Sequence, residues 1–273
     1  MMEDAAAPER IDGTVVSRDG TTIGYSRFGA GTPLVVCHGA FNAAADWVRF
    51  ARALRGSHSV LLYDRRGRGR SEAGRGPYSL AAEMDDLAAV VALAGDGAAV
   101  LGHSFGGGCA LMYALRDGFR GRLVLYEAMS ALPQPLGGAH LPALRALVAA
   151  GDHDAATAFA LEHIVRTPPE KLALLRQTPL WPGMVALTPG FVQEAAALDT
   201  IAPTAAELAA LRARPWLLLG ERSEQDPSMR CTAALVERLR GATLYPIPGQ
   251  GHAAHLFNPA LLARIVARCL VED

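Results

Sequence analysis

Short, almost wholly apolar segments recur along this chain and alternate with longer segments that have apolar residues at helical spacing. The apolar segments lie at residues 34–37, 60–63, 98–101, 123–126, 216–219 and 244–247. The helical segments lie at residues 44–54, 80–93, 107–116, 228–239 and 259–271. Strands that are apolar along their whole length are typical of a parallel sheet covered by helices on both faces. The alternation therefore predicts an α/β fold.

Two parts of the chain depart from this alternation. Residues 14–18 and 22–28 resemble two strands joined by a turn at Asp19-Gly20, which predicts an antiparallel hairpin. Residues 131–203 are rich in Ala, Leu and Pro, have helical spacing and contain no convincing strand. We therefore expect a flexible tail at residues 1–10, a core domain formed by residues 11–130 and 204–273, and a helical lid at residues 131–203.

The charge balance limits the kind of partner. Lys and Arg total 26 and Asp and Glu total 27 in 273 residues, so the net charge is -1. This balance gives no electrostatic case for nucleic acid or an anionic membrane. The first residues lack the basic and apolar regions of a secretory signal, and no run of about 18 apolar residues occurs. We expect a cytoplasmic protein with a small-molecule substrate and with neither nucleic acid nor membrane as a partner, while the oligomeric state stays open.

The four cysteines are scattered, at Cys37, Cys109, Cys231 and Cys269. No CxxC pair and no histidine at metal-ligand spacing accompanies them. We therefore expect reduced, mostly buried thiols and no metal site.

The apolar segment at residues 98–101 runs into Gly102-His103-Ser104-Phe105-Gly106, and small and helix-forming residues follow. This pattern predicts a strand, a tight turn and a helix, with Ser104 on the turn. A nucleophilic serine on such a strained turn needs very small residues two positions before and after it, because the turn brings their backbones close together. Gly102 and Gly106 meet that requirement, so Ser104 is the expected nucleophile.

A serine hydroxyl is a poor nucleophile unless a histidine takes its proton and a carboxylate orients that histidine. His252 lies in a flexible loop directly after the last apolar segment, from which its imidazole can fold back over the carboxyl edge of the sheet. We expect His252 to be the base. His103 and His255 are expected to pack near the site without acting in the reaction.

Attack on a carbonyl builds negative charge on its oxygen, so backbone N–H groups must already point at that position. The N–H of Phe105, at the start of the helix after Ser104, is one expected donor. The loop after residues 34–37 supplies the second, because His38-Gly39 lets the backbone turn sharply there. Ala40 is the expected second donor, and Phe41 is the next choice.

Four motifs together resemble the α/β-hydrolase superfamily. They are His38-Gly39, the run Asp-Arg-Arg-Gly-Arg-Gly-Arg-Ser at residues 64–71, Gly-His-Ser-Phe-Gly-Gly at residues 102–107 and Gly-Gln-Gly-His at residues 249–252. Each follows an expected strand, and the resemblance covers residues 14–271. It implies an eight-stranded, mostly parallel sheet with helices on both faces and a helical lid inserted after the sixth strand. It also implies no metal and no organic cofactor, and a mainly structural loop at residues 64–71.

The carboxylate of the expected triad is where the chain departs from the superfamily's pattern. Most relatives carry an aspartate three residues past a glycine after the seventh strand, and that position is Ser223 here. Asp226 or Glu224 could replace it if the loop is wound differently, although Asp226 before Pro227 could instead cap the next helix. Glu127, directly after residues 123–126, is the leading candidate, because some haloalkane dehalogenases of the superfamily resemble it in carrying their acid there. A carboxylate at that strand end also needs a partner such as an imidazolium.

These residues predict a serine hydrolase that cleaves a carboxylic ester, lactone or thioester of a small, largely apolar molecule through an acyl-enzyme on Ser104. Phe41, Trp181 and Phe191 are expected to contact the substrate, although aromatic residues at such spacing can also form the core of a lid. One alternative is a lyase, an acyl transferase or a cofactor-free haloperoxidase or perhydrolase on the same site. Another is a ligand-binding relative without activity, which the serine at position 223 leaves open.

Overall fold

An eight-stranded sheet forms the centre of the computed structural model, which describes residues 9–223, 230–239 and 241–271. The strand order is β1-β2-β4-β3-β5-β6-β7-β8. Strand β2 pairs antiparallel with β1 and β4, and all other neighbours are parallel. The strands are β1 (Ile11–Val16), β2 (Thr22–Phe28), β3 (Thr32–Cys37), β4 (His58–Tyr63), β5 (Ala99–His103), β6 (Leu123–Tyr126), β7 (Pro215–Gly220) and β8 (Thr243–Ile247). The expected α/β fold with a mostly parallel sheet is confirmed.

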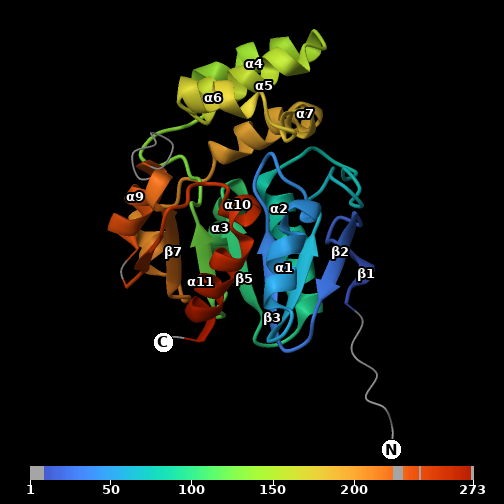
Figure 1. Ribbon diagram of the computed structural model, residues 1–273, viewed down its shortest axis with the longest axis vertical. Coiled ribbons are helices and arrows are strands. Elements are labelled where there is room, and N and C mark those ends of the chain that lie inside the picture. The colour runs from blue at the N-terminus through green and yellow to red at the C-terminus, as the bar shows by residue number, and fades with distance from the viewer. Residues whose placement is uncertain (1–8, 224–229, 240, 272–273) are drawn as a thin grey trace, which may run out of the picture.

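Helices cover both faces of the sheet (Figure 1). Helices α1 (Val48–Leu54) and α11 (Pro259–Val271) pack on one face, and α2 (Leu80–Ala94), α3 (Phe105–Arg116) and α9 (Arg230–Arg238) pack on the other. Along β3, Val35 packs in one hydrophobic cluster with residues of α2 and α3, whereas Leu34 and Val36 pack in another with residues of α1 and α11. Because successive side chains of a strand point to opposite faces, burial of both faces requires the continuous apolar segments seen in the sequence.

A group of helices between β6 and β7 lies over the carboxyl edge of the sheet, and we call it the cap (Figure 1). It comprises α4 (Leu141–Ala149), α5 (His153–Phe159), a π-helical turn at Ala160–Ile164, α6 (Pro169–Leu175) and α7 (Trp181–Leu198). Helix α8 (Ala205–Ala209) follows before β7. The Asp199 carboxylate accepts hydrogen bonds from the N–H groups of Leu136, Gly137 and Gly138, at 2.8, 2.9 and 2.6 Å. These bonds tie the exit of the cap to its entrance.

The structure differs from the expected element boundaries at two places near the site. Residues Ala44–Trp47 form a 3₁₀ turn before α1 rather than the first turn of an α-helix. Strand β5 continues through His103, which pairs with Tyr126, and α3 already begins at Phe105. The turn between them is therefore the single residue Ser104, so strand and helix abut more closely than the spacing predicted.

The remaining short helix is α10 (Ala254–Phe257), and 3₁₀ turns occur at Gly138–His140 and Glu221–Ser223. All four cysteines are buried, and none of them forms a disulfide. In the part of the chain that the structure describes, no helix is both long and apolar enough to cross a membrane.

Candidate active site

Ser104 joins β5 to α3 in a left-handed conformation, with φ 54° and ψ -124°. Four backbone hydrogen bonds hold this strained residue in place. Its N–H donates to the carbonyl of Tyr126 at 3.0 Å, and its own carbonyl accepts the N–H groups of Gly107, Gly108 and Met129 at 3.0, 3.2 and 2.9 Å. The turn is fixed, and the Ser104 side chain lines a cavity at the carboxyl edge of the sheet.

The two glycines beside Ser104 are required by close backbone approach. A Cβ on Gly106 would lie 2.3 Å from the carbonyl oxygen of Cys37 and 2.4 Å from that of His38. A Cβ on Gly102 would lie 2.7 Å from the Cα of Gly107. Backbone atoms cannot swing away as a flexible side chain can, so the tight turn excludes a larger residue at either position.

His252 and Glu127 come together although 125 positions separate them in the sequence. The His252 Nδ1 lies 2.5 Å from the Glu127 Oε2, and Glu127 is fully buried. The other carboxylate oxygen of Glu127 accepts the N–H of Gly220 at 2.8 Å. Both oxygens of the buried carboxylate are therefore partnered. The bond to His252 occupies Nδ1, and Nε2 has no hydrogen-bond partner among the described residues, so it is available as a base.

The other positions considered for the acid follow β7 in the sequence. Asp226 and Glu224 lie outside the described residues. Ser223 is buried, and its hydroxyl oxygen would lie 3.3 Å from a Cβ on Gly251, in the loop that carries His252. The position that holds an aspartate in most relatives is thus beside the histidine loop, where it presents a hydroxyl group.

Two buried side chains hold the histidine loop over the sheet edge. The Tyr126 hydroxyl donates to the carbonyl of Gly251 and accepts the N–H of Ala254 at 3.0 Å. His103 contacts the carbonyl of His252 through its Nε2 at 2.9 Å, so the Nε2 must carry the proton. Burial, with nearby His252 and His255, holds the pKa of His103 well below its ordinary value. His103 therefore serves the loop as a neutral donor.

Tyr126 is a residue that the sequence analysis missed. The available signal was an aromatic residue with a polar tip at the end of an apolar strand, directly before Glu127.

The loop after β3 lies against the strand-to-helix turn at Ser104, which we call the elbow. A Cβ on Gly39 would be 3.0 Å from the Cβ of Ser104, and both Ala40 and Phe105 line the cavity with Ser104. Within the described ranges, the N–H groups of Ala40 and Phe105 have no hydrogen-bond acceptor. Two unused donors thus flank the serine, as an oxyanion hole requires.

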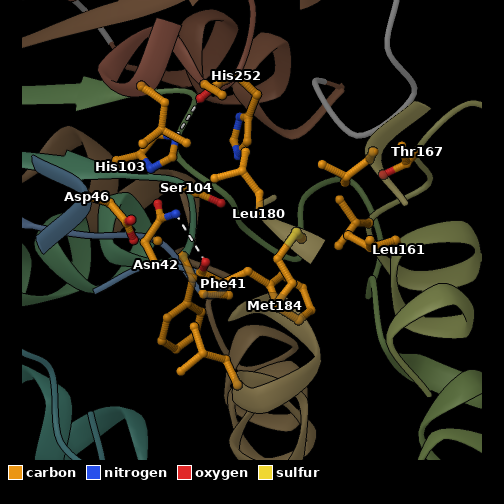
Figure 2. A pocket seen from close by; sticks show the side chains of 18 of the residues that line it. Phe41, Asn42, Asp46, His103, Ser104, Leu161, Thr167, Leu180, Met184 and His252 are labelled. Atoms are coloured by element: carbon orange, nitrogen blue, oxygen red, sulfur yellow. Dashed lines mark hydrogen bonds between the residues drawn. The ribbon is translucent and has the colours of Figure 1, made fainter. Parts of the chain in front are cut away.

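The cavity has a volume of about 800 Å³ and opens between the cap and the sheet edge (Figure 2). Ser104 and His252 both line it. Its cap side is mainly apolar, with Leu161, Ile164, Met184, Leu187 and Phe191. On the other side of Ser104, Asn42 and Asp46 supply polar groups (Figure 2). This combination of an apolar wall with a few polar groups is typical of small-molecule sites.

Phe41 and Phe191 line this cavity, but Trp181 does not. The Trp181 ring packs with Leu161 and Leu172 inside the cap, and its Nε1–H donates to Asp154 at 2.6 Å. An indole that is buried in this way needs a partner for its N–H, and α5 supplies one. The expectation that Trp181 contacts the substrate is therefore corrected: Trp181 belongs to the core of the cap.

The fold and the arrangement of these residues are those of the α/β-hydrolase class of proteins. A family profile described as "Alpha/beta hydrolase family" matches residues 34–265. The chain belongs to the alpha/beta hydrolase family.

Individual relatives agree with this assignment. The crystal structure of an alpha/beta hydrolase from Sphaerobacter thermophilus has 30% sequence identity and a TM-score of 0.85, with 95% of this chain and 100% of that chain covered. Among curated proteins, a non-heme chloroperoxidase of Streptomyces lividans is 37% identical over 44% of this chain and 45% of its own length. A non-heme haloperoxidase of Rhodococcus erythropolis is 36% identical over 44% of each chain. The chain thus matches less than half the length of these two curated relatives.

Proposed function

We propose that the protein is a serine hydrolase that cleaves a carboxylic ester, lactone or thioester through an acyl-enzyme on Ser104. One observation carries the proposal: Ser104 occupies a strained turn on a cavity that it shares with His252, and His252 is bonded to a buried carboxylate, Glu127. A nucleophile, a base and a group that orients the base are the three parts that acyl transfer through serine requires.

In the first half of the reaction, the His252 Nε2 takes the proton of the Ser104 hydroxyl as the oxygen attacks the substrate carbonyl. Negative charge develops on the carbonyl oxygen, and the N–H groups of Ala40 and Phe105 stabilise it. Glu127 accepts the Nδ1–H and stabilises the imidazolium that forms. His252 then gives its proton to the leaving alcohol or thiol, which leaves the acyl group on Ser104.

In the second half, His252 takes a proton from water, and the resulting nucleophile attacks the acyl carbonyl. The same N–H groups stabilise the second tetrahedral intermediate. His252 returns the proton to Ser104, and the carboxylic acid leaves.

The lining of the cavity supports a largely apolar acyl group. The cap supplies aliphatic and aromatic side chains around the space next to Ser104, and a volume of about 800 Å³ is large enough for a small aromatic or medium-chain acyl group. Asn42 and Asp46 lie on the opposite side, where a polar leaving group fits (Figure 2).

A second candidate activity is favoured by the two curated relatives named as non-heme chloroperoxidase and haloperoxidase. It needs the same residues, with hydrogen peroxide in place of water as the attacker of the acyl-enzyme. The product is then a peroxy acid, which oxidises halide in solution. Bromination of an indicator dye, with acetate and hydrogen peroxide supplied, distinguishes this outcome from simple hydrolysis.

Steady-state turnover of p-nitrophenyl esters with acyl chains of increasing length tests the proposal. We expect release of p-nitrophenol and of the matching carboxylic acid by the wild-type protein. Ser104→Ala should reduce kcat by about 10⁴-fold or more, because the nucleophile is lost. A folded wild-type protein that leaves every ester intact would overturn the proposed function.

A further inference from the structure

Two arginines and two glutamates form a buried ion cluster between the core and the cap. Arg65 is fully buried and donates to both carboxylate oxygens of Glu83 on α2, at 3.0 and 2.8 Å. Arg65 and Arg68 each donate to the Oε1 of Glu194, which is 2% exposed and belongs to α7 of the cap, at 2.5 Å. Although burial favours the neutral guanidine, the carboxylates of Glu194 and Glu83 hold the pKa of Arg65 well above its ordinary value. The charges balance, so the cluster can be buried intact.

Arg65 connects the cluster to the loop after β3, residues 38–42, which we call the oxyanion loop. Its guanidinium donates to the carbonyl of Gly39 at 3.2 Å, and His38 donates to the same oxygen through its Nδ1 at 2.9 Å. The Gly39 carbonyl and the Ala40 N–H belong to one peptide unit, and that unit is planar. A bond that fixes the oxygen therefore also fixes the direction of the N–H. A charged donor on the oxygen polarises the peptide further and makes its N–H a stronger donor.

The far end of this loop is held by Arg68, which is bonded to Glu194 of α7, and by a ring of α7 itself. Arg68 donates to the carbonyl of Asn42 at 3.1 Å. The ring of Phe41 stacks on that of Phe191, with centroids 4.5 Å apart. Phe191 and Glu194 are three positions apart on α7 and therefore lie on one face of that helix. One helix of the cap thus holds the oxyanion loop through an ion cluster and through a ring pair.

We propose that Glu194 is a positioning residue that couples the cap to the oxyanion hole. Through Arg65, its carboxylate sets the orientation of the Gly39–Ala40 peptide, whose N–H faces the developing charge. The inference rests on the proposed serine-hydrolase function and goes beyond it, since it makes turnover depend on a docked α7. No residue of the proposed triad contacts Glu194 among the described hydrogen bonds.

A purely stabilising role for Glu194 makes different predictions. Loss of stability alone lowers the melting temperature but leaves kcat of the folded protein unchanged. A positioning role lowers kcat, because the N–H matters most in the transition state, and changes KM little. Among the described residues, the buried Oε2 of Glu194 has no hydrogen-bond partner, so the carboxylate is not placed for maximal hydrogen bonding.

The experiment compares Glu194→Gln and Glu194→Asp with Gln193→Ala, a control on the exposed side of the same helix. Ester kinetics and the rate of Ser104 phosphonylation by a fluorophosphonate are measured well below the melting temperature, per folded protein. For Glu194→Gln we expect kcat and the phosphonylation rate to fall about 10- to 100-fold, with KM within about threefold, since loss of a whole oxyanion donor costs about 10²- to 10³-fold. Glu194→Asp should recover part of the loss, and Gln193→Ala should match the wild type.

A Glu194→Gln variant with wild-type kcat and wild-type phosphonylation would overturn the inference alone. If that variant does not fold, Glu194→Asp decides: kcat equal to that of the wild type overturns the inference, and a selective loss of kcat supports it. A wild-type protein that neither turns over esters nor reacts with the probe would instead overturn the proposed function, and the inference with it.

Discussion

Glu127 lies after β6, whereas the pattern of most relatives expects the acid after β7, at Ser223. It follows β6 in the left-handed region, with φ 43°, and its N–H donates to the carbonyl of Leu218 at 2.9 Å. Strands β6 and β7 are neighbours, so a carboxylate at the end of either strand points toward the same histidine loop. The Glu127 side chain contacts His252 from the end of β6, which lies next to β5 and its nucleophile, whereas Ser223 follows β7, one strand farther away.

A substitution at this residue tests the assignment of the acid. We predict that Glu127→Gln lowers kcat for an aryl ester by about 10⁴-fold, because the amide cannot hold the correct tautomer or stabilise the imidazolium. Asp226→Asn should stay within about threefold of the wild type. Near-full activity of Glu127→Gln would contradict the assignment of Glu127, and an inactive Asp226→Asn would favour Asp226 in its place.

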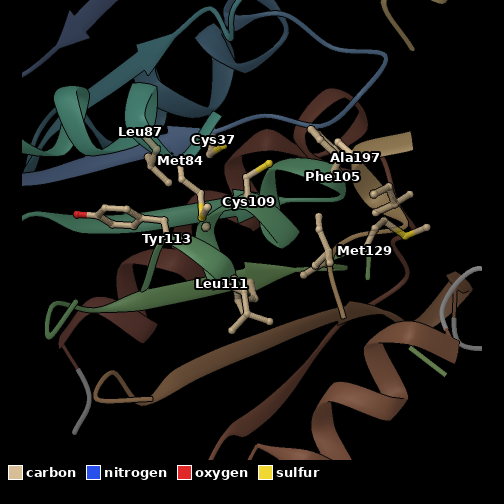
Figure 3. Packing of buried hydrophobic residues seen from close by; sticks show 14 of the residues in the cluster. Cys37, Met84, Leu87, Phe105, Cys109, Leu111, Tyr113, Met129 and Ala197 are labelled. Carbon is tan, nitrogen blue, oxygen red and sulfur yellow. The ribbon is translucent and has the colours of Figure 1, made fainter. Parts of the chain in front are cut away.

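Among the elements of the core, the strand-to-helix turn at Ser104 leaves no room for a larger residue at Gly102 or Gly106. Helix α3 packs its buried face, including Cys109 and Leu111, into the main hydrophobic cluster, and Phe105 extends that packing to the turn (Figure 3). Its first turn also presses Gly106 against the backbone at the end of β3. The helix cannot retreat to make room, because its buried face is already packed.

Alanine at two glycines distinguishes this close approach from ordinary helical preference. Gly106→Ala should lower the free energy of unfolding by about 3 kcal/mol or more, because the new methyl group meets two carbonyl groups. Gly190→Ala, in α7, meets nothing within 4 Å and should raise that free energy by up to about 1 kcal/mol through helix propensity. Urea denaturation of both variants measures the difference. Equal stability of Gly106→Ala and the wild type would contradict the account of the turn.

The elements of the core were predictable from the sequence because their signals are local. Apolar runs located the strands of the core, and glycine spacing located the elbow. The contacts of the cap with the core were not predictable. Arg65 and Glu194 are 129 positions apart, and no periodicity in either segment links them. Trp181 shows the same limit, since a buried indole in a cap and one that faces a substrate have the same sequence pattern.

Over the whole molecule, buried histidines connect stability to pH. His38, His103 and His255 are each at most 2% exposed, and burial lowers the pKa of all three, to about 3 for His255. In the unfolded chain the pKa of each histidine is about 6.5. Between these two values the unfolded state binds more protons than the folded state. The free energy of unfolding should therefore decrease as the pH falls below about 6.5, by about 1.4 kcal/mol per pH unit for each histidine.

His255 allows this prediction to be tested at one site. Its ring stacks on Trp47 with centroids 4.4 Å apart, and neither of its nitrogens has a partner among the described residues. His255→Phe keeps the stacking and removes the titration, so the unfolding free energy should decrease less between pH 7 and pH 5 than in the wild type. Urea denaturation at both pH values measures the slope. An unchanged slope would show that His255 does not titrate in the unfolding reaction as proposed.

The role of Ser104 as the nucleophile depends on the reactivity of its hydroxyl oxygen, which is measured by the mass of the intact protein after exposure to a fluorophosphonate. We expect a mass increase of one phosphonyl group, located at Ser104 by peptide mapping and absent from Ser104→Ala. A folded wild-type protein that gains no mass, or that carries the label at another residue, would overturn the assignment of Ser104 as the nucleophile.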